Sequence, residues 1–190
     1  LHRNSKRQAL KNISYHYDLG NNFYKLWLDE TMTYSSALFK TGQESLEKAQ
    51  TAKYASMVDH MGVSPGDHVL EIGCGWGGFA EYAAAQRGLI VTGLTISNEQ
   101  LEFARKRIES KGLQDKVKFK LQDYRDETGK YDGVASIEMF EAVGEVFSDY
   151  KPKISSTKSL AGHSLGATSV HEAIYSLIMM KNNFIAASAN

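Results

Sequence analysis

The stretch VLEIGCGWGG, Val69 to Gly78, decides the fold of this chain. A short apolar run containing the acid Glu71 leads directly into a cluster of four glycines, Gly73, Gly75, Gly77 and Gly78. Because glycine has no Cβ, such a cluster lets the backbone turn tightly and approach a ligand closely. An Ala-rich helical stretch follows and ends at Gly88, a typical C-cap. Strand, glycine turn and helix in this order predict the nucleotide-binding start of a doubly wound α/β sheet.

The glycine spacing also indicates the kind of ligand. It differs from the dinucleotide fingerprint, and the Lys-Ser/Thr pair of a phosphate loop is missing. The E-x-G-x-G form, which begins at Glu71, fits S-adenosylmethionine better, because this ligand has no phosphate for the glycines to bind. We expect Glu71, Gly73 and Gly75 to contact this cofactor, with the two glycines seating its amino acid part. A glycine turn that serves packing alone is the alternative interpretation.

The composition excludes several classes of protein. The 190 residues predict one domain of ordinary size, and 22 basic and 22 acidic residues cancel, which gives no electrostatic case for binding nucleic acid. The single cysteine, Cys74, excludes an internal disulfide and a cysteine-based zinc cluster, and it indicates a reducing, cytoplasmic setting. No apolar run reaches the ~18 residues of a membrane span, and the basic N-terminus leads into no apolar signal core.

Strand-like and helical segments alternate along the chain. Strands are expected at 68–72, 89–96, 117–121 and 131–137, and helices at 44–62, 79–86 and 98–112. This alternation predicts a parallel sheet with helices on both faces, a Rossmann-like class I methyltransferase sheet truncated after about four strands. The first forty residues are rich in aromatic side chains and predict a lid or a substrate-facing segment. After residue 146 the strand period is lost, and a helical tail is expected.

Four further residues, at or just after the ends of the second and third strands, are candidates for the cofactor site. Thr95, at the end of the second strand, and Gln100, one helical turn later, can both hydrogen-bond a ribose hydroxyl. Gln100 fits equally well as the second member of a capping box with Ser97. Asp123 and Tyr124 follow the third strand, where an adenine is normally read; Asp123 as a helix N-cap is the alternative.

Four pieces of the chain together resemble the cyclopropane-fatty-acyl-phospholipid synthase family, which includes the mycolic acid cyclopropane synthases. In order along the chain they are YHYDLGNNFYKLWLDETMTYSSALF, VLEIGCGWGGFAEYAA, GLTISNEQLEFARKRI and DYRDETGKYDGVASIEMFEAVGE. The resemblance covers about residues 12–145. It implies transfer of the methyl carbon of S-adenosylmethionine to a cis double bond of a phospholipid acyl chain, followed by proton loss and ring closure.

The resemblance also implies roles for individual residues. Tyr34 and Ser35 match a pair that contacts the cofactor, and Thr95 and Gln100 fall in its ribose and adenosine region. His16 and Glu141 match positions around a bound bicarbonate, the family's base: the imidazole donates to the anion, and the carboxylate accepts its hydroxyl proton. Ser36 departs from the pattern, because many relatives have cysteine there. The implied substrate places the protein in the cytoplasm, at the inner face of the membrane.

The tail has a different resemblance. From about residue 145 onward, with the motif STKSLAGHSLGA, it is similar to the C-terminal part of β-ketoacyl-acyl-carrier-protein synthases, and Lys158 and His163 match that family's lysine–histidine motif. We therefore expect a chimera of two incomplete domains, 1–145 and 146–190. The family of the first part continues well past this point, and the chain begins at Leu1, so we also expect a fragment.

Four functions follow as hypotheses. They are a cyclopropane-synthase-type methyltransferase impaired by truncation, a β-ketoacyl synthase fragment, a serine hydrolase built on the Gly162–Gly166 elbow, and a non-catalytic chimeric fragment. The second lacks its cysteine nucleophile, and the third lacks an acid and a histidine in the required order after the serine. The methyltransferase is the prediction that the residues favour.

Overall fold

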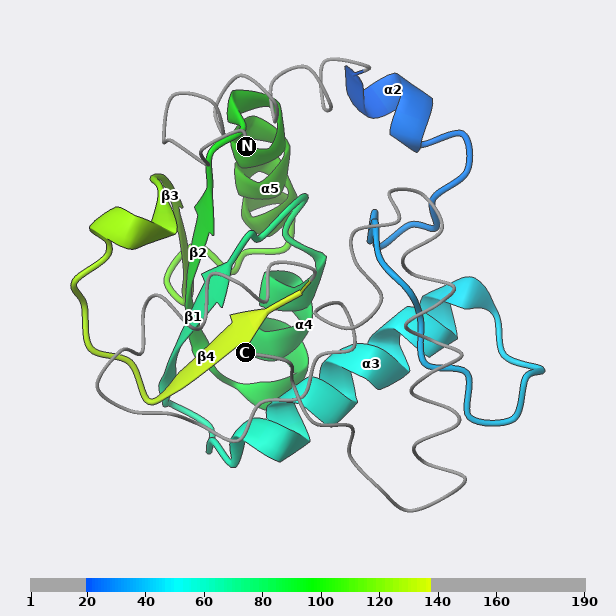
Figure 1. Ribbon diagram of the computed structural model, residues 1–190, viewed down its shortest axis with the longest axis horizontal. Helices are drawn as coiled ribbons and strands as arrows, with labels where there is room; N and C mark the ends of the chain where they lie inside the picture. The colour runs from blue at the N-terminus through cyan, green and yellow to red at the C-terminus, as the bar shows by residue number, and fades with distance from the viewer. Residues whose placement is uncertain (1–19, 138–190) are drawn as a thin grey trace, which may run out of the picture. The chain divides into compact units, whose positions relative to one another are not determined.

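The computed structural model describes residues 20–137, which belong to one unit of the chain, Leu1–Ala142 (Figure 1). Its centre is a sheet of four parallel strands in the order β3-β2-β1-β4. The strands are β1 (His68–Ile72), β2 (Ile90–Thr95), β3 (Val117–Leu121) and β4 (Gly133–Ser136). From β1 the chain adds β2 and β3 on one side and then returns to add β4 on the other side. The carboxyl end of β1 is therefore the switch point where ligands of such sheets bind.

The interior position of β1 explains its sequence. Val69, Leu70 and Ile72 are all at most 1% exposed, and β1 has a neighbouring strand on each side. Such a strand has an apolar run without alternation. Glu71 is the exception, and its partners in the register are the small residues Gly93 and Ala135. The carboxyl side chain is thus accommodated between positions with little or no side chain.

Three long helices pack as one layer in the described part of the chain. These are α3 (Leu46–Met61), α4 (Gly78–Arg87) and α5 (Asn98–Ser110); α4 contacts both of the others, and each of the three also packs on a strand (Figure 1). They lie on one face of the sheet, as successive right-handed crossovers require. The predicted helices on both faces are therefore seen on one face only, over residues 20–137.

The local signals for helix ends are confirmed. Gly88 adopts a left-handed conformation with φ of 68° at the end of α4, and Ser97 accepts a hydrogen bond from the backbone N–H of Gln100 at the start of α5. The turn at Ser64–Asp67 closes with a hydrogen bond from Asp67 N to Ser64 O of 3.0 Å. The predicted second and fourth strands were too long by one to two residues at each end, since strand pairing is limited to the shared register.

The aromatic N-terminal segment packs against the glycine turn. After the short helix α2 (Gly20–Tyr24), the chain runs without regular structure to residue 45. Tyr24 and Met32 form a small buried cluster with Trp76 of the glycine turn, separate from the main core. None of the helices within residues 20–137 is long and apolar enough to pass through a bilayer.

Candidate cofactor site

The glycine turn after β1 adopts a conformation that other residues rarely reach. Gly73, Gly75 and Gly77 have φ values of 75°, 52° and 82°, all in the left-handed region. The turn is fixed to the neighbouring strand by hydrogen bonds from Gly73 N and Cys74 N to Leu94 O, of 3.0 and 2.8 Å. A Cβ added at Gly75 would meet no atom within 4 Å. This glycine therefore borders open space, as a ligand-contacting position requires.

The other two glycines of the turn serve packing instead. A Cβ at Gly77 would lie 3.1 Å from the Ala104 Cβ atom of α5. A Cβ at Gly78 would lie 2.7 Å from both the Thr31 carbonyl oxygen and the Tyr54 hydroxyl. The packing alternative thus holds for Gly77 and Gly78, and Gly75 differs from both of them.

Glu71 places a carboxyl group at the base of this turn. The side chain is 2% exposed, and its Oε2 atom has no hydrogen-bond partner among the described residues. Burial raises the pKa of Glu71 from 4.5 to about 8. An unpartnered buried carboxyl oxygen is costly, so a cationic or hydrogen-donating ligand at this point would stabilise the ionised form.

Thr95 and Gln100 form a pair of their own at the end of β2. The Thr95 hydroxyl donates to Gln100 Oε1 at 2.9 Å and accepts a hydrogen bond from Ser97 N at 3.1 Å. One half of the predicted capping box is therefore present, because the Ser97 side chain accepts from Gln100 N. In the other half, the backbone N–H of Ser97 donates to the Thr95 hydroxyl and not to the Gln100 side chain. The Gln100 side chain is directed to the strand end and not to the cap, which leaves the ribose assignment as a prediction.

Asp123 and Tyr124 follow β3 on the same edge of the sheet. Asp123 Oδ1 accepts from Arg125 N at 3.0 Å and caps the single turn η1 (Tyr124–Asp126). The same carboxylate forms an ion pair with Arg125, at 2.6 Å between Oδ2 and Nη2. The capping role that the sequence left open for Asp123 is thus present, and adenine contacts of Asp123 and Tyr124 stay a prediction.

Tyr34 and Ser35 lie on the aromatic segment. The Tyr34 ring, 41% exposed, contacts the rings of Tyr24 and Trp27 at 5.6 and 5.3 Å between centroids, and Tyr24 in turn contacts Trp76 at 4.9 Å. A continuous aromatic cluster therefore connects Tyr34 to the glycine turn. Trp76 is further fixed by a hydrogen bond of 2.6 Å from its indole N–H to Asn21 Oδ1.

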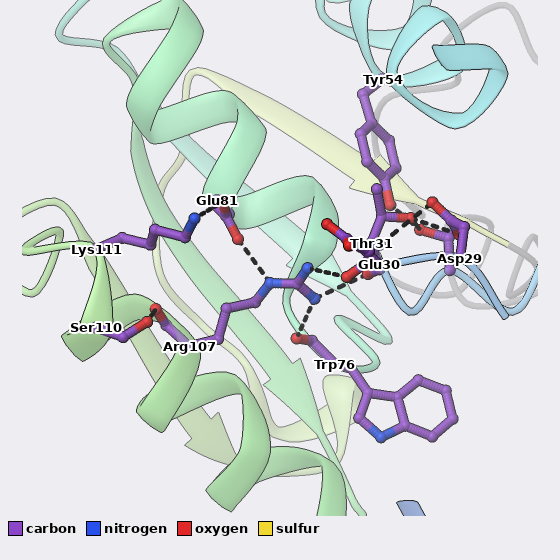
Figure 2. Close-up of polar contacts among 10 residues, drawn as sticks. Asp29, Glu30, Thr31, Tyr54, Trp76, Glu81, Arg107, Ser110 and Lys111 are labelled. Carbon is purple, nitrogen blue, oxygen red and sulfur yellow. Dashed lines mark hydrogen bonds and ion pairs between the residues drawn. The ribbon is translucent and has the colours of Figure 1, made fainter. Parts of the chain in front are cut away.

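Arg107 of α5 holds the aromatic segment and the glycine turn together (Figure 2). Its guanidinium donates to the carbonyl oxygens of Glu30 and Thr31, both at 2.8 Å, and of Trp76 at 3.2 Å, while Nε pairs with Glu81 at 2.6 Å. This role of Arg107 was not predicted from the sequence. The available signal was a charged residue three positions after the buried Ala104, beside the apolar face of its helix.

Two side chains of α3 were missed as well. Gln50 and Lys53 donate hydrogen bonds to the segment at Ser35 and Ser36. The signal for Gln50 was a polar residue in the buried stripe that continues at Tyr54 and Val58, at spacings of four. Polar residues in such a stripe usually have a specific partner.

Some predicted residues lie outside the described part of the chain. His16 and Glu141 are among them, as are Lys158 and His163 of the tail. Cys74 is buried, and burial raises the pKa of its thiol, so it does not fit the thiolate nucleophile that a condensing enzyme needs.

Comparison with known proteins assigns the family. The model of the mycolic acid cyclopropane synthetase family matches residues 4–186. This match continues beyond residue 145 and gives no support to the predicted change of ancestry there. The division into domains at 145 stays a prediction.

Curated relatives agree with this family. The chain is 45% identical over 141 residues to a probable fatty acid methyltransferase of Pseudomonas putida, over 73% of this chain and 36% of the relative. It is 44% identical over 140 residues to the cyclopropane-fatty-acyl-phospholipid synthase of Escherichia coli K12, over 74% and 35%. The chain thus spans about a third of the length of these relatives.

Solved structures give the same result. The cyclopropane synthase MmaA2 from Mycobacterium tuberculosis has a TM-score of 0.69 at 26% identity, covering 90% of this chain and 67% of that protein. The mycolic acid cyclopropane synthase CmaA1, solved with SAH and CTAB, has a TM-score of 0.68 at 25% identity with the same coverage. By sheet, glycine turn and family match, the chain belongs to the mycolic acid cyclopropane synthetase family, whose members are S-adenosylmethionine-dependent methyltransferases.

Proposed function

We propose that this chain binds S-adenosylmethionine at the carboxyl edge of its sheet and contributes to methyl or methylene transfer onto a cis double bond of a phospholipid acyl chain. The observation that carries the proposal is the turn at Gly75, which is left-handed, borders open space and follows the interior strand β1. If the turn served packing alone, we would expect side chains to fill the space next to Gly75.

The residues around the turn fit the chemical groups of this cofactor. Glu71 offers a buried carboxyl oxygen without a partner to a positively charged group. Thr95 and Gln100 offer uncharged hydrogen-bonding groups suited to ribose hydroxyls. We assign the adenine to Asp123 and Tyr124, which follow β3 on the same edge of the sheet.

When bound, S-adenosylmethionine supplies a methyl carbon on a sulfonium centre. The contribution of the chain is to seat and orient it, with Gly73 and Gly75 at the amino acid part. The exposed face of Tyr34 stabilises a nearby cation, and the aromatic cluster behind it keeps water away from that side. The base remains the bicarbonate prediction, with His16 and Glu141, both outside the described residues.

The lipid substrate is inferred from the relatives. One is named a probable fatty acid methyltransferase and another a cyclopropane-fatty-acyl-phospholipid synthase. We infer a phospholipid acyl chain, reached at the membrane surface from the cytoplasmic side, as the acceptor. Exposed apolar side chains on the aromatic segment, Phe23, Leu26 and Trp27, are consistent with contact to acyl chains.

Calorimetric titration with S-adenosylhomocysteine tests the cofactor site. We expect the chain to bind it and Gly75→Val to abolish binding, because the added side chain would enter the open space. Gly112→Val is the matched control, since Gly112 has a φ of 66° and also borders open space, but lies after α5. Equal loss in both variants, or no binding by the unaltered chain, contradicts the proposal.

Transfer is tested separately. The chain is incubated with S-adenosylmethionine and phospholipid vesicles that carry cis-monounsaturated acyl chains, and the lipids are analysed by mass spectrometry. We expect acyl chains heavier by one methylene unit. Unchanged acyl chains, in a preparation that binds S-adenosylhomocysteine, would show a binding site without transfer and contradict the second half of the proposal.

A further inference from the structure

Two side chains of α3 hold Ser35 in place by hydrogen bonds. Gln50 Nε2 donates to the Ser35 carbonyl oxygen at 2.8 Å, and the Gln50 side chain is 1% exposed. Lys53 Nζ donates to the Ser35 hydroxyl and, at 2.8 Å, to the Ser36 carbonyl oxygen. Both the backbone and the side chain of Ser35 are thereby held in one position, which is unusual for a residue outside regular structure.

The contact with Lys53 determines whether the Ser35 hydroxyl accepts or donates a hydrogen bond there. An ammonium group only donates hydrogen bonds, so the Ser35 oxygen is the acceptor in this contact. The hydroxyl proton of Ser35 is not used in this contact and is left to be donated to another acceptor. A positive charge on the oxygen side also makes the hydroxyl a stronger donor. The arrangement thus prepares a donor for an acceptor brought by a ligand.

The position of Ser35 connects this donor to the cofactor site. The neighbouring residues Thr31 and Thr33 lie against Gly78, at 2.7 and 3.4 Å from where its Cβ would be. Thr33 and Tyr54 also share a hydrogen bond, so α3, the aromatic segment and the glycine turn form one assembly. Ser35 and Lys53 are therefore linked through this assembly to the glycine turn at the start of α4.

We propose that Lys53 is a positioning residue that directs the Ser35 hydroxyl, and adds positive charge, toward the carboxylate of an amino acid group in the bound ligand. The inference rests on the proposed function, because it assigns one end of the cofactor to one wall of the site. It extends that function to a residue of α3.

The distribution of charge around the site supports this assignment. The unpartnered Glu71 oxygen suits an ammonium, and once an ammonium has favoured its ionisation it would repel a carboxylate. Thr95 and Gln100, on the side of β2, are uncharged and suit hydroxyl groups. Lys53 is the cation that hydrogen-bonds the segment carrying Tyr34 and Ser35 from α3. A carboxylate is the group of the cofactor that matches a cation and a hydroxyl donor together.

The test compares two ligands that differ in the amino acid part. S-adenosylhomocysteine has the carboxylate and ammonium, whereas 5′-methylthioadenosine has the same nucleoside thioether without them. We expect Lys53→Met to weaken binding of S-adenosylhomocysteine by about tenfold or more, the usual effect of losing a charge-assisted contact, with 5′-methylthioadenosine unaffected. Lys48→Met is the matched control, an exposed lysine on the same helix whose loss should change neither affinity.

A double-mutant cycle with Ser35→Ala keeps the proposal testable if Lys53→Met folds poorly. When Ser35 is already alanine, the substitution of Lys53 should cost less for S-adenosylhomocysteine than in the unaltered chain, because the two act through one contact. Equal weakening of both ligands would mean a purely structural role, and no weakening would mean no role; either overturns the inference while leaving the cofactor site in place. Failure of the unaltered chain to bind S-adenosylhomocysteine would instead refute the proposed function.

Discussion

Single residues of the glycine turn differ in what they require of their surroundings. Gly75 borders open space, Gly77 is close to α5, and Gly78 is in direct contact with the aromatic segment. Sequence spacing could not distinguish them, because the same missing Cβ serves a ligand in one place and a neighbouring chain segment in another. The distinction depends on contacts over 20 residues or more along the chain.

Gly78→Ala is expected to destabilise the fold. In an exposed helix this change would gain about 1 kcal/mol of helix propensity. Here the new methyl group would lie 2.7 Å from a backbone oxygen and a buried hydroxyl, and such overpacking costs about 1–3 kcal/mol. We expect a net loss of about 1 kcal/mol in urea unfolding. In a Tyr54→Phe background the loss should shrink, since one of the two contacts is gone; a stabilised variant would contradict the packing.

Glu71 is expected to release a proton when the ligand binds. Burial raises the pKa of Glu71 to about 8, so near pH 7 the free protein holds the carboxyl protonated. A cationic group beside it lowers this pKa and favours ionisation, so affinity should increase as the pH is raised toward 8.

Titration with S-adenosylhomocysteine in buffers of different ionisation enthalpy measures this proton release. Glu71→Gln, which keeps the shape of the side chain, should abolish it. Proton release of the same size in the variant would mean that another group titrates.

At the scale of elements, Arg107 of α5 joins the aromatic segment, the glycine turn and α4. Its guanidinium pairs with Glu81 of α4 and donates to the carbonyl oxygens of residues 30, 31 and 76. These carbonyls belong to residues that lie close in sequence to Met32 or pack in its cluster, and the Met32 backbone is left-handed with φ of 54°. A non-glycine residue in this conformation persists only where its surroundings impose it. The guanidinium and the buried Met32 side chain supply that constraint.

Arg107→Lys should loosen the aromatic segment. A lysine can keep the charge opposite Glu81, but it lacks the planar fork that reaches several carbonyl groups at once. We expect a loss of about 2 kcal/mol in stability and faster hydrogen exchange over residues 29–36. Arg105→Lys, on the same helix with one carbonyl contact at 3.2 Å, is the control and should leave this exchange unchanged. Unaltered exchange in both variants would contradict the role of Arg107.

The elements themselves were predictable, and most of their contacts were not. β1, the glycine turn and α4 follow from an apolar run, glycines and a helix cap that lie within 20 residues of sequence. The capping of η1 by Asp123 was anticipated as an alternative, since its signal is also local. Arg107, Gln50 and Lys53 escaped prediction because each contacts a segment 15 to 77 residues away, and nothing local distinguishes them from solvated side chains.

At the scale of the whole molecule, a buried acid in the centre of the sheet makes stability depend on pH. Burial in the folded chain raises the pKa of the Glu71 carboxyl to about 8 from its ordinary value of 4.5, which applies to the unfolded chain. Between these values the folded chain holds a proton that the unfolded chain has lost, so the free energy of unfolding falls as the pH rises. The slope is at most about 1.4 kcal/mol per pH unit for one group.

Urea unfolding of the ligand-free chain and of Glu71→Gln, at several pH values between about 5 and 8, measures this term. The difference in stability between the two should shift in favour of the variant as the pH rises. A difference that is flat, or that shifts the other way, would show that Glu71 is ionised in the folded chain.

The long separation between Arg107 and residues 30–31 has a consequence for synthesis. A nascent chain emerges from the ribosome with its aromatic stretch first, and the arginine that secures it follows 76 to 77 residues later. At roughly 5–20 residues per second, Tyr24, Trp27 and Met32 wait several seconds without their final neighbours. During that interval the stretch exposes apolar side chains that the finished fold covers, which is when a chain is most prone to aggregate.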